Sequence, residues 1–248
     1  MDSLGDRMKL QYENRTRYSL PRRSYTILRL DGRAFHTFTR GLAKPFDHRF
    51  IEAMSSTATG LCEQIQGTKF AYVQSDEISL LLTDFETPQT EAWFDGNIQK
   101  MCSIAASIGT VEFNRAWEGD RLAHFDARAF TIPDEVEVEN YFIWRQKDWT
   151  RNSLQMLARA NFSHKELHEK GQADMHEMLH TKGINWADCS EREKNGTLIL
   201  KDLTGVWNVF PAFIFTGDDR AQLTKLIPKR WPESFPADNQ ISNDVNDG

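Results

Sequence analysis

The sequence has few cysteines and no hydrophobic run long enough to cross a bilayer. Its three cysteines, Cys62, Cys102 and Cys189, are far apart and odd in number, which disfavours a disulfide framework and a zinc knuckle. The first residues also lack the charged and then apolar pattern of a signal peptide. Together these absences predict a soluble protein of the reducing cytoplasm.

An excess of basic residues is also missing, and the sequence shows no internal repeat. The formal net charge is −6 and the sequence pI is about 5.7, which argues against a surface that binds nucleic acid by overall charge. Five arginines lie within residues 15–29, so the sequence still allows a local basic face. Of the 248 residues, 40% are hydrophobic and 27% are charged, which suits one large or two small domains with a core.

The most informative segment is an apolar, β-rich run at residues 70–82 (FAYVQSDEISLLL), interrupted by three polar residues. Ser75, Asp76 and Glu77 stand between its two apolar halves, which predicts a tight reversal between two strands. The Asp76 carboxylate would then point out from the end of a sheet. Glu77 follows Asp76 in the hairpin and should face the other way, so a structural role suits it as well as a catalytic one.

A second aspartate follows another strand. Residues 25–30 (YTILRL) are typical of a buried strand, and this strand runs into Asp31 and Gly32. Alone, such an aspartate is often only a turn residue. If the two strands are neighbours in one sheet, however, Asp31 and Asp76 can share divalent cations, because carboxylate oxygens and open water positions suit Mg²⁺. Two such ions could activate a hydroxyl and stabilise an in-line displacement at phosphorus.

Hydrophobic periodicity predicts the remaining elements. One helix should begin after Asp47, its N-cap, and end before Gly67. The order is then strand, helix, hairpin, helix, strand, helix, which is typical of an α+β domain with two long helices on one face of a mainly antiparallel sheet. The other expected elements are helices at about 89–112 and 134–160, short helices within 163–182, and strands at 124–132, 198–200 and 206–215.

Five ordered motifs in this chain resemble the tRNA-histidine guanylyltransferase family and its relatives. They are 30–36 (LDGRAFH), 44–47 (KPFD), 75–79 (SDEIS), 125–128 (FDAR) and 144–146 (WRQ), and the resemblance covers roughly residues 20–215. It implies an enzyme that adds nucleotides to the 5′ end of tRNA in the 3′-to-5′ direction. The implied substrates and ligands are tRNA, ATP, GTP and two Mg²⁺ ions, and the implied assembly is a homotetramer.

The same resemblance implies the fold. We expect a polymerase-palm-like (ferredoxin-like) antiparallel sheet with long helices on one face and a C-terminal helical and β extension. Residues 1–135 would form the catalytic core, residues 136–231 would complete the same domain, and residues 232–248 would be a disordered tail.

For the site, the resemblance implies that Asp31 and Asp76 hold the two ions together with the Gly32 carbonyl. Glu77 is a further catalytic candidate. The turn from Gly32 to His36 would cradle a triphosphate through its backbone N–H groups. The nucleotide-binding candidates are Arg29, Gly32, Arg33, Ala34, Phe35, His36, Lys44, Asp47, Ser75, Lys100 and Arg128.

Two further assignments have a structural explanation as well as a chemical one. Asp47 could read a guanine edge through its carboxylate, and it is equally well placed as a helix N-cap. Arg145, Asp148 and Asn152 share one helical face and are candidates for a second nucleotide or the RNA end, although a polar outer face would look the same.

One departure from the family pattern is informative. Eukaryotic members carry a HINNLYN run after the WRQ motif, whereas this chain has residues 150–156 (TRNSLQM) and lacks the histidine. This form is similar to the bacterial and archaeal branch, whose members carry out template-dependent 5′-end repair on several tRNAs. The departure weakens a strict assignment to the addition of one guanylate to histidine tRNA.

Two rival interpretations remain. A palm-type nucleotide cyclase also pairs acids on a hairpin, but such cyclases usually place two glycines before the acidic pair, where this chain has Gln74 and Ser75. A non-catalytic RNA- or nucleotide-binding protein could keep the same fold. The histidine pairs of residues 164–180 lack a third ligand at a convincing spacing, so a solvated helix face is favoured there over zinc.

Overall fold

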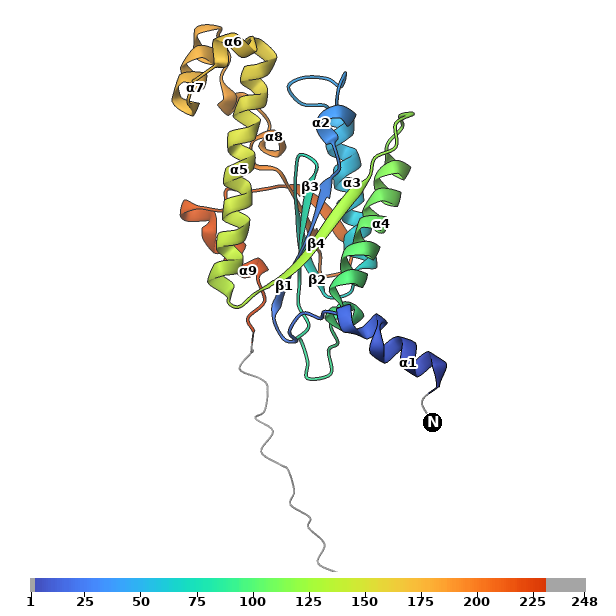
Figure 1. Cartoon of the computed structure of the whole chain (residues 1–248). Helices are drawn as coiled ribbons and strands as arrows, with labels where there is room; N and C mark the ends of the chain where they lie inside the picture. The colour runs from blue at the N-terminus through green and yellow to red at the C-terminus, as the bar shows by residue number, and fades with distance from the viewer. Residues whose placement is uncertain (1–2, 231–248) are drawn as a thin grey trace, which may run out of the picture.

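The computed structural model describes residues 3–230, and in that range one antiparallel sheet of six strands forms the centre of the molecule (Figure 1). The strands are β1 (Tyr25–Gly32), β2 (Thr68–Gln74), β3 (Glu77–Leu82), β4 (Phe125–Ile132), β5 (Thr197–Lys201) and β6 (Trp207–Pro211). Their order is β4-β1-β3-β2-β5-β6, and every neighbouring pair is antiparallel. The first four strands follow the β-α-β-β-α-β order of the ferredoxin-like fold, so the predicted class is confirmed.

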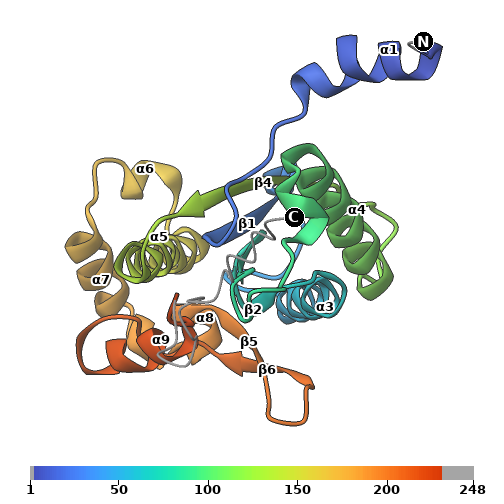
Figure 2. The same cartoon turned by 90° about the horizontal axis from the view of Figure 1, so that it is seen from below.

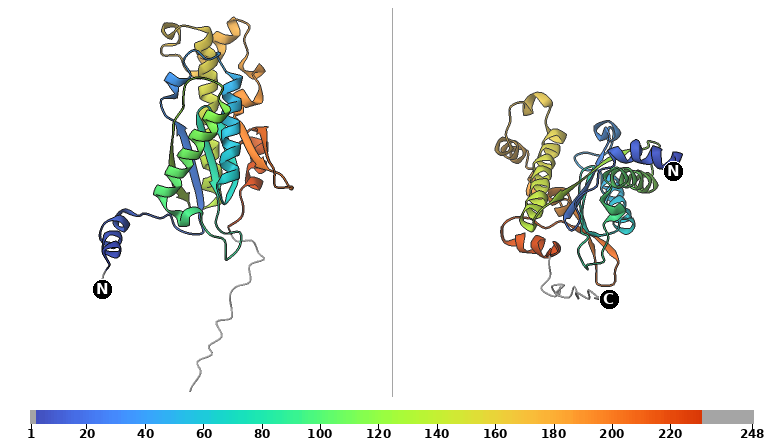
Figure 3. Two further views of the ribbon diagram at one scale, coloured as in Figure 1. Left: turned by 90° about the vertical axis from the view of Figure 1, so that its right-hand side faces the viewer. Right: turned by 60° about the horizontal axis from the view of Figure 1, so that its bottom comes forward.

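Helices cover both faces of this sheet (Figure 2). Within the described range they are α1 (Leu4–Gln11), α2 (Phe35–Phe38), α3 (His48–Gln64), α4 (Ile98–Ala116), α5 (Glu135–Asn161), α6 (His164–Leu167), α7 (Gln172–Thr181), α8 (Glu191–Asn195) and α9 (Arg220–Leu226). Short 3-10 turns occupy Glu13–Thr16, Trp93–Gly96, Trp186–Asp188 and Gly217–Asp219. Helices α3 and α4 pack on one face, as predicted, and α5 packs on the other. Helix α1 extends away from this body (Figure 3).

The alternation of β1 explains why a second layer is needed. Leu28 and Leu30 belong to the core shared with α3 and α4, whereas Tyr25 and Ile27 belong to the core shared with α5. All six residues of β3 are buried. Central strands that are apolar on both faces require cover on both faces, because a single helical layer would leave half of those side chains in water.

Two predicted boundaries shift for local reasons. Helix α4 begins at Ile98 and not near residue 89, because the Asn97 side chain accepts a hydrogen bond from the Lys100 N–H at 2.9 Å and caps the helix there. The strand expected at 206–215 ends at Pro211. The hairpin of β5 and β6 joins the same sheet as the first four strands.

Several expectations concern absences or the chain end. The three cysteines are all free. Among residues 3–230, no helix combines the length and the apolar composition that a bilayer span requires. The tail predicted at 232–248 lies outside the described residues.

Candidate active site

The two predicted metal-binding aspartates meet at one end of the sheet. Strands β1 and β3 are hydrogen-bonded neighbours, and Asp31 stands directly opposite Glu77 in their ladder. The Gly32 N–H donates to the Asp76 carbonyl at 3.0 Å, which ties the end of β1 to the turn between β2 and β3. The predicted hairpin and the predicted pairing of the two strands are therefore confirmed, and the geometry brings Asp31 and Asp76 together.

The charges at this end are close and poorly neutralised. Burial raises the pKa of Asp76 to about 6, and the negative charges of Asp31 and Glu77 add to the shift. Burial also raises the pKa of Asp31, helped by Glu77 and Asp126 and opposed by Arg128. Within the described residues, neither Asp31 nor Asp76 forms an ion pair. Partly desolvated carboxylates without a basic partner are a fitting environment for a hard cation.

The number of protein ligands also fits Mg²⁺. In the part of the chain that the structure describes, no group of three or more His, Cys, Asp or Glu side chains converges on a metal position. Magnesium is commonly held by one or two carboxylates together with water and substrate phosphates. Two aspartates at the sheet end match this open coordination, whereas they do not match a closed structural site.

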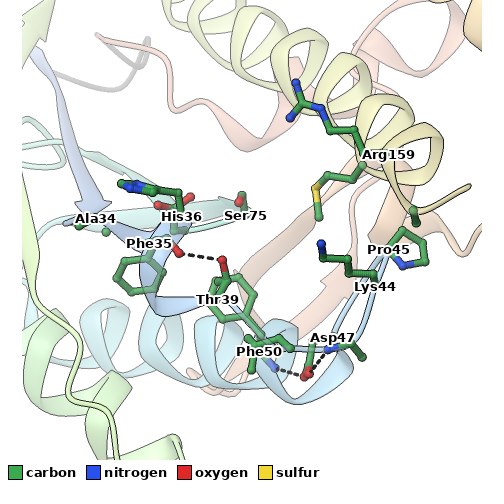
Figure 4. A pocket seen from close by; sticks show the side chains of 16 residues that line it. Ala34, Phe35, His36, Thr39, Lys44, Pro45, Asp47, Phe50, Ser75 and Arg159 are labelled. Atoms are coloured by element: carbon green, nitrogen blue, oxygen red, sulfur yellow. Dashed lines mark hydrogen bonds between the residues drawn. The ribbon is translucent and has the colours of Figure 1, made fainter. Parts of the chain in front are cut away.

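A cavity of about 560 Å³ lies next to Asp76 (Figure 4). It is enclosed by the end of β1, helix α2, the loop before α3, the β2–β3 turn and the last turns of α5. Its lining residues are Gly32, Ala34, Phe35, His36, Thr39, Leu42, Ala43, Lys44, Pro45, Asp47, Phe50, Ser75, Asp76, Met156, Arg159 and Ala160. The volume suits a ligand of nucleotide size.

The backbone around this cavity has unusual local conformations. Ala34 and Ser75 adopt left-handed dihedrals, with φ values of 56° and 48°, although neither is glycine. A Cβ atom on Gly32 would overlap the Phe35 ring, so only glycine allows this close approach. The first N–H groups of α2 have no acceptor inside the helix, and their residues Phe35 and His36 line the cavity. The predicted phosphate-binding turn therefore has open donors beside the cavity.

Both carboxylate oxygens of Asp47 accept hydrogen bonds from the backbone. Oδ1 accepts from the Phe50 N–H at 3.2 Å and caps α3, and Oδ2 accepts from the Ala43 N–H at 3.1 Å. Burial alone would raise the pKa of Asp47, but the two backbone hydrogen bonds and Arg49 outweigh it and hold the pKa below its ordinary value. The predicted N-cap is confirmed, and the side chain also lines the cavity.

We expect Asp47→Ala to lower the free energy of unfolding by about 1–2 kcal/mol, because it removes a helix cap and a loop anchor. The wild-type contribution should be complete above the ordinary Asp pKa and should disappear as the pH falls through the lowered folded-state pKa. Urea unfolding at pH 7 and pH 3 measures both effects. Asp134 caps α5 through a single hydrogen bond from the Glu137 N–H, so the matched variant Asp134→Ala should lower the free energy of unfolding by less. Equal losses at both positions would contradict the anchoring role.

The structure brings many of the predicted site residues to the cavity and leaves others apart from it. Those that line it are Gly32, Ala34, Phe35, His36, Lys44, Asp47, Ser75 and Asp76. Arg33 does not line it; its N–H donates to the His124 carbonyl at 2.8 Å, and its side chain is exposed. Arg29 and Arg128 stand opposite each other in the β1–β4 ladder.

Lys100 is not brought to the cavity within this chain. It lies in the first turn of α4, where its Nζ is 5.8 Å from the Phe94 ring centroid. Gly109 of the same helix lies against Leu30, and roughly 13 Å of helix separate it from Lys100. Its role as a phosphate partner was implied by the family resemblance, and this helix begins at the opposite end of the sheet from Asp31.

Glu77 and Arg145 are paired with each other. Arg145 Nε and Nη2 donate to the two Glu77 oxygens at 2.7 Å each, and its Nη1 donates to Asp148 at 2.8 Å. Both members of the Glu77–Arg145 pair are buried. The helical face predicted to meet RNA is thus divided: Arg145 turns inward to Glu77, Asp148 bridges Arg145 and Arg151, and Asn152 is exposed.

Three other residues near the site were not identified as candidates from the sequence. Arg159 and Met156 reach the cavity from the last turns of α5, more than 120 residues after Asp31. Asp126 stands directly opposite Asp31 in the β1–β4 ladder. The alternation of β4 places Asp126 and Arg128 on one face, and this signal could have identified Asp126.

The fold and sequence are similar to those of known proteins. A family model described as tRNAHis guanylyltransferase matches residues 5–133. A solved bacterial tRNA(His) guanylyltransferase (Thg1)-like protein in complex with ATP is 43% identical with a TM-score of 0.86, and the match covers 91% of this chain and 99% of that chain. A second such structure, in complex with GTP, is 41% identical with a TM-score of 0.80 over the same shares. The tRNA(His) guanylyltransferase of Debaryomyces hansenii is 30% identical over 201 residues, which are 72% of this chain and 74% of that protein.

Proposed function

The chain belongs to the tRNAHis guanylyltransferase family, and from this premise we propose that it adds nucleotides to the 5′ end of tRNA in the 3′-to-5′ direction with the help of Mg²⁺. It is a nucleotidyltransferase by this membership. The observation that carries the proposal is the convergence of Asp31 and Asp76 beside a cavity of nucleotide size. The similarity to structures that bind ATP and GTP supports the same conclusion.

The reaction forms one phosphodiester bond at the 5′ end of the tRNA and breaks one bond to a leaving group. The 3′ hydroxyl oxygen of the incoming nucleotide forms a bond to the activated 5′ phosphorus of the tRNA and gives up its proton. The bond from that phosphorus to the leaving group breaks, and the leaving group is pyrophosphate from a 5′-triphosphate or AMP from an adenylylated end. Mg²⁺ at Asp31 and Asp76 would stabilise the charge that spreads over the phosphate oxygens.

The chain's own groups would position the nucleotide. The N–H groups at the start of α2 belong to residues that line the cavity, and they can donate hydrogen bonds to phosphate oxygens. Lys44 and Arg159 add positive charge from two sides of the same cavity, as Figure 4 shows. Fixed cations and donors stabilise the transition state most where charge develops during transfer.

The finer assignments rest on the similarity. Identities of 43% and 41% to the bacterial structures exceed the 23% to the Saccharomyces cerevisiae structure, which favours 5′-end repair on several tRNAs over strict guanylate addition. We further propose that the protein acts in the cytoplasm as a homotetramer, and that its chain divides into a core at 1–135 and an extension at 136–231. We assign Glu77 a structural role at the site, because its carboxylate is paired with Arg145.

Incubation with a 5′-truncated tRNA tests the proposal directly. With Mg²⁺, ATP and radiolabelled GTP, we expect the label to enter the RNA, and we expect EDTA to abolish incorporation. A labelled cyclic nucleotide would identify a cyclase, and binding of the nucleotide without any product would identify a non-catalytic protein. Either of these outcomes contradicts the proposed function.

A further inference from the structure

The connection between α4 and β4 contacts the segment that forms much of the cavity wall. Residues 34–45, called the cavity loop below, contain α2 and supply half of the residues that line the cavity. Residues 117–124, called the α4–β4 connection below, lie at the same end of the sheet as α2 (Figure 1). Arg121 of this connection does not line the cavity, although it contacts the cavity loop.

The cavity loop has little regular structure of its own. Its one helix, α2, has four residues, and isolated helices much longer than this are only marginally stable in water. The loop contains the basic residues Arg40 and Lys44 and no acid, so no ion pair can form within it. Its conformation must therefore be fixed by contacts with the rest of the chain.

Aromatic packing fixes only the first part of the loop. Phe35 and Phe38 are buried, with the Phe35 ring centroid 5.2 Å from that of Phe125 and the Phe38 centroid 5.4 Å from that of Trp117. After Phe38, no residue of the loop is fully buried. The part of the loop that carries Lys44 therefore depends on a polar anchor.

Arg121 supplies such an anchor at the end of α2. Its Nη1 donates to the carbonyls of Phe38 and Arg40 at 3.0 Å each and lies 3.4 Å from the Thr37 carbonyl. The last carbonyls of a helix have no partner inside the helix, so an external donor satisfies them. Among the described residues, no acid forms an ion pair with Arg121, and its donors are directed to the loop.

The backbone that carries this arginine is itself held from two sides. Asn114 of α4 donates from Nδ2 to the Ala123 carbonyl at 2.9 Å, and its Oδ1 accepts from the Ala123 N–H at 2.8 Å. The Arg33 N–H donates to the His124 carbonyl at 2.8 Å, directly after the end of β1. The α4–β4 connection thus fixes the cavity loop relative to the strand end that carries the candidate metal ligand.

We propose that Arg121 is a positioning residue for the nucleotide: it holds the cavity loop so that α2 and Lys44 keep their places around the bound triphosphate. Arg121 does not touch the nucleotide in this arrangement. The inference rests on the proposed function and deepens it, because it names a determinant of nucleotide affinity outside the cavity. A loop that is ordered before binding loses less conformational entropy when the ligand arrives, so loss of the anchor should weaken nucleotide binding.

Calorimetric titration with GTP and Mg²⁺, combined with kinetics, tests this role. Arg121→Met keeps an unbranched side chain and removes the donors, and a hydrogen bond from a charged donor contributes a factor of about 10 or more to an equilibrium constant. We expect the Kd for GTP to rise about tenfold, while kcat at saturating GTP and the KM for RNA stay within about twofold. Arg121→Lys keeps a cationic donor and should recover most of the loss. Arg115→Met is the control, because Arg115 is exposed and pairs only with Glu112 of the same helix.

The competing role for Arg121 is direct contact with RNA, since its side chain is exposed and cationic. In that case Arg121→Met would raise the KM for RNA and reduce its dependence on salt, and the Kd for GTP would not change. An unchanged Kd for GTP, with or without an effect on RNA, would overturn the inference. Calorimetry does not need turnover, so a wild type that binds GTP and never labels RNA would contradict only the proposed function, while weaker binding by Arg121→Met would still support the positioning role.

Discussion

Asp76→Asn is expected to reduce nucleotide addition by about 1,000-fold or more while making the metal-free protein more stable. The loss of activity follows because the amide removes one of two carboxylates that hold Mg²⁺. The gain in stability follows because burial raises the pKa of Asp76 to about 6, so the ionised side chain opposes folding at neutral pH. Removing that charge should add on the order of 1–3 kcal/mol to the free energy of unfolding.

Two measurements check this opposite behaviour: initial rates with saturating Mg²⁺, and urea unfolding in EDTA. Mg²⁺ should raise the melting temperature of the wild type and should have little effect on Asp76→Asn. Asp202 is the matched control, because its carboxylate accepts bonds from Thr204, Val206 and Asn208 in an exposed turn that lowers its pKa to about 2. Asp202→Asn should lose stability and keep its activity. A destabilised Asp76→Asn with full activity would refute the assignment of Asp76 to a metal site.

Arg145→Met is expected to lower the free energy of unfolding by about 3–5 kcal/mol, because it leaves the buried Glu77 carboxylate without its cation. The side chains of Arg145 and Glu77 are only 11% and 12% exposed, and two hydrogen bonds of 2.7 Å join them. Such a loss is a large part of the total stability of an ordinary domain. Urea unfolding at pH 7 measures it.

The double variant Arg145→Met with Glu77→Gln isolates the unpaired charge. It should recover much of the lost stability, since a neutral glutamine can still accept from Gln74 and Ser79 on β2 and β3. Arg151→Met is the control, because Arg151 is exposed and its pair with Asp148 should contribute less than about 1 kcal/mol. A loss of RNA binding without any loss of stability in Arg145→Met would return Arg145 to the RNA surface that the sequence suggested.

Local sequence signals were sufficient for the elements that carry the site. The apolar, β-rich runs on either side of residues 75–77 determine two strands and a tight turn, and Asp47 before an amphipathic stripe determines the start of α3. These signals work because the backbone conformation of a turn or a cap depends on residues a few positions apart. The boundary of α4 was missed because the Asn97 cap was not recognised.

Contacts between distant segments were decided only by the tertiary structure. From its position on α5 alone, Arg145 could have faced either RNA or Glu77 of β3. The packing of α5 across the second face of the sheet brings it to Glu77. The same packing brings Arg159 to the cavity and leaves Trp144 half exposed beside Arg29, and the direction of α4 keeps Lys100 at the far end. Helical periodicity fixes which residues share a face, but the partner of that face depends on the balance of apolar burial over the whole chain. The sequence by itself thus determined the acids and the turns that present them, and the tertiary structure determined which charges remain free to meet a substrate.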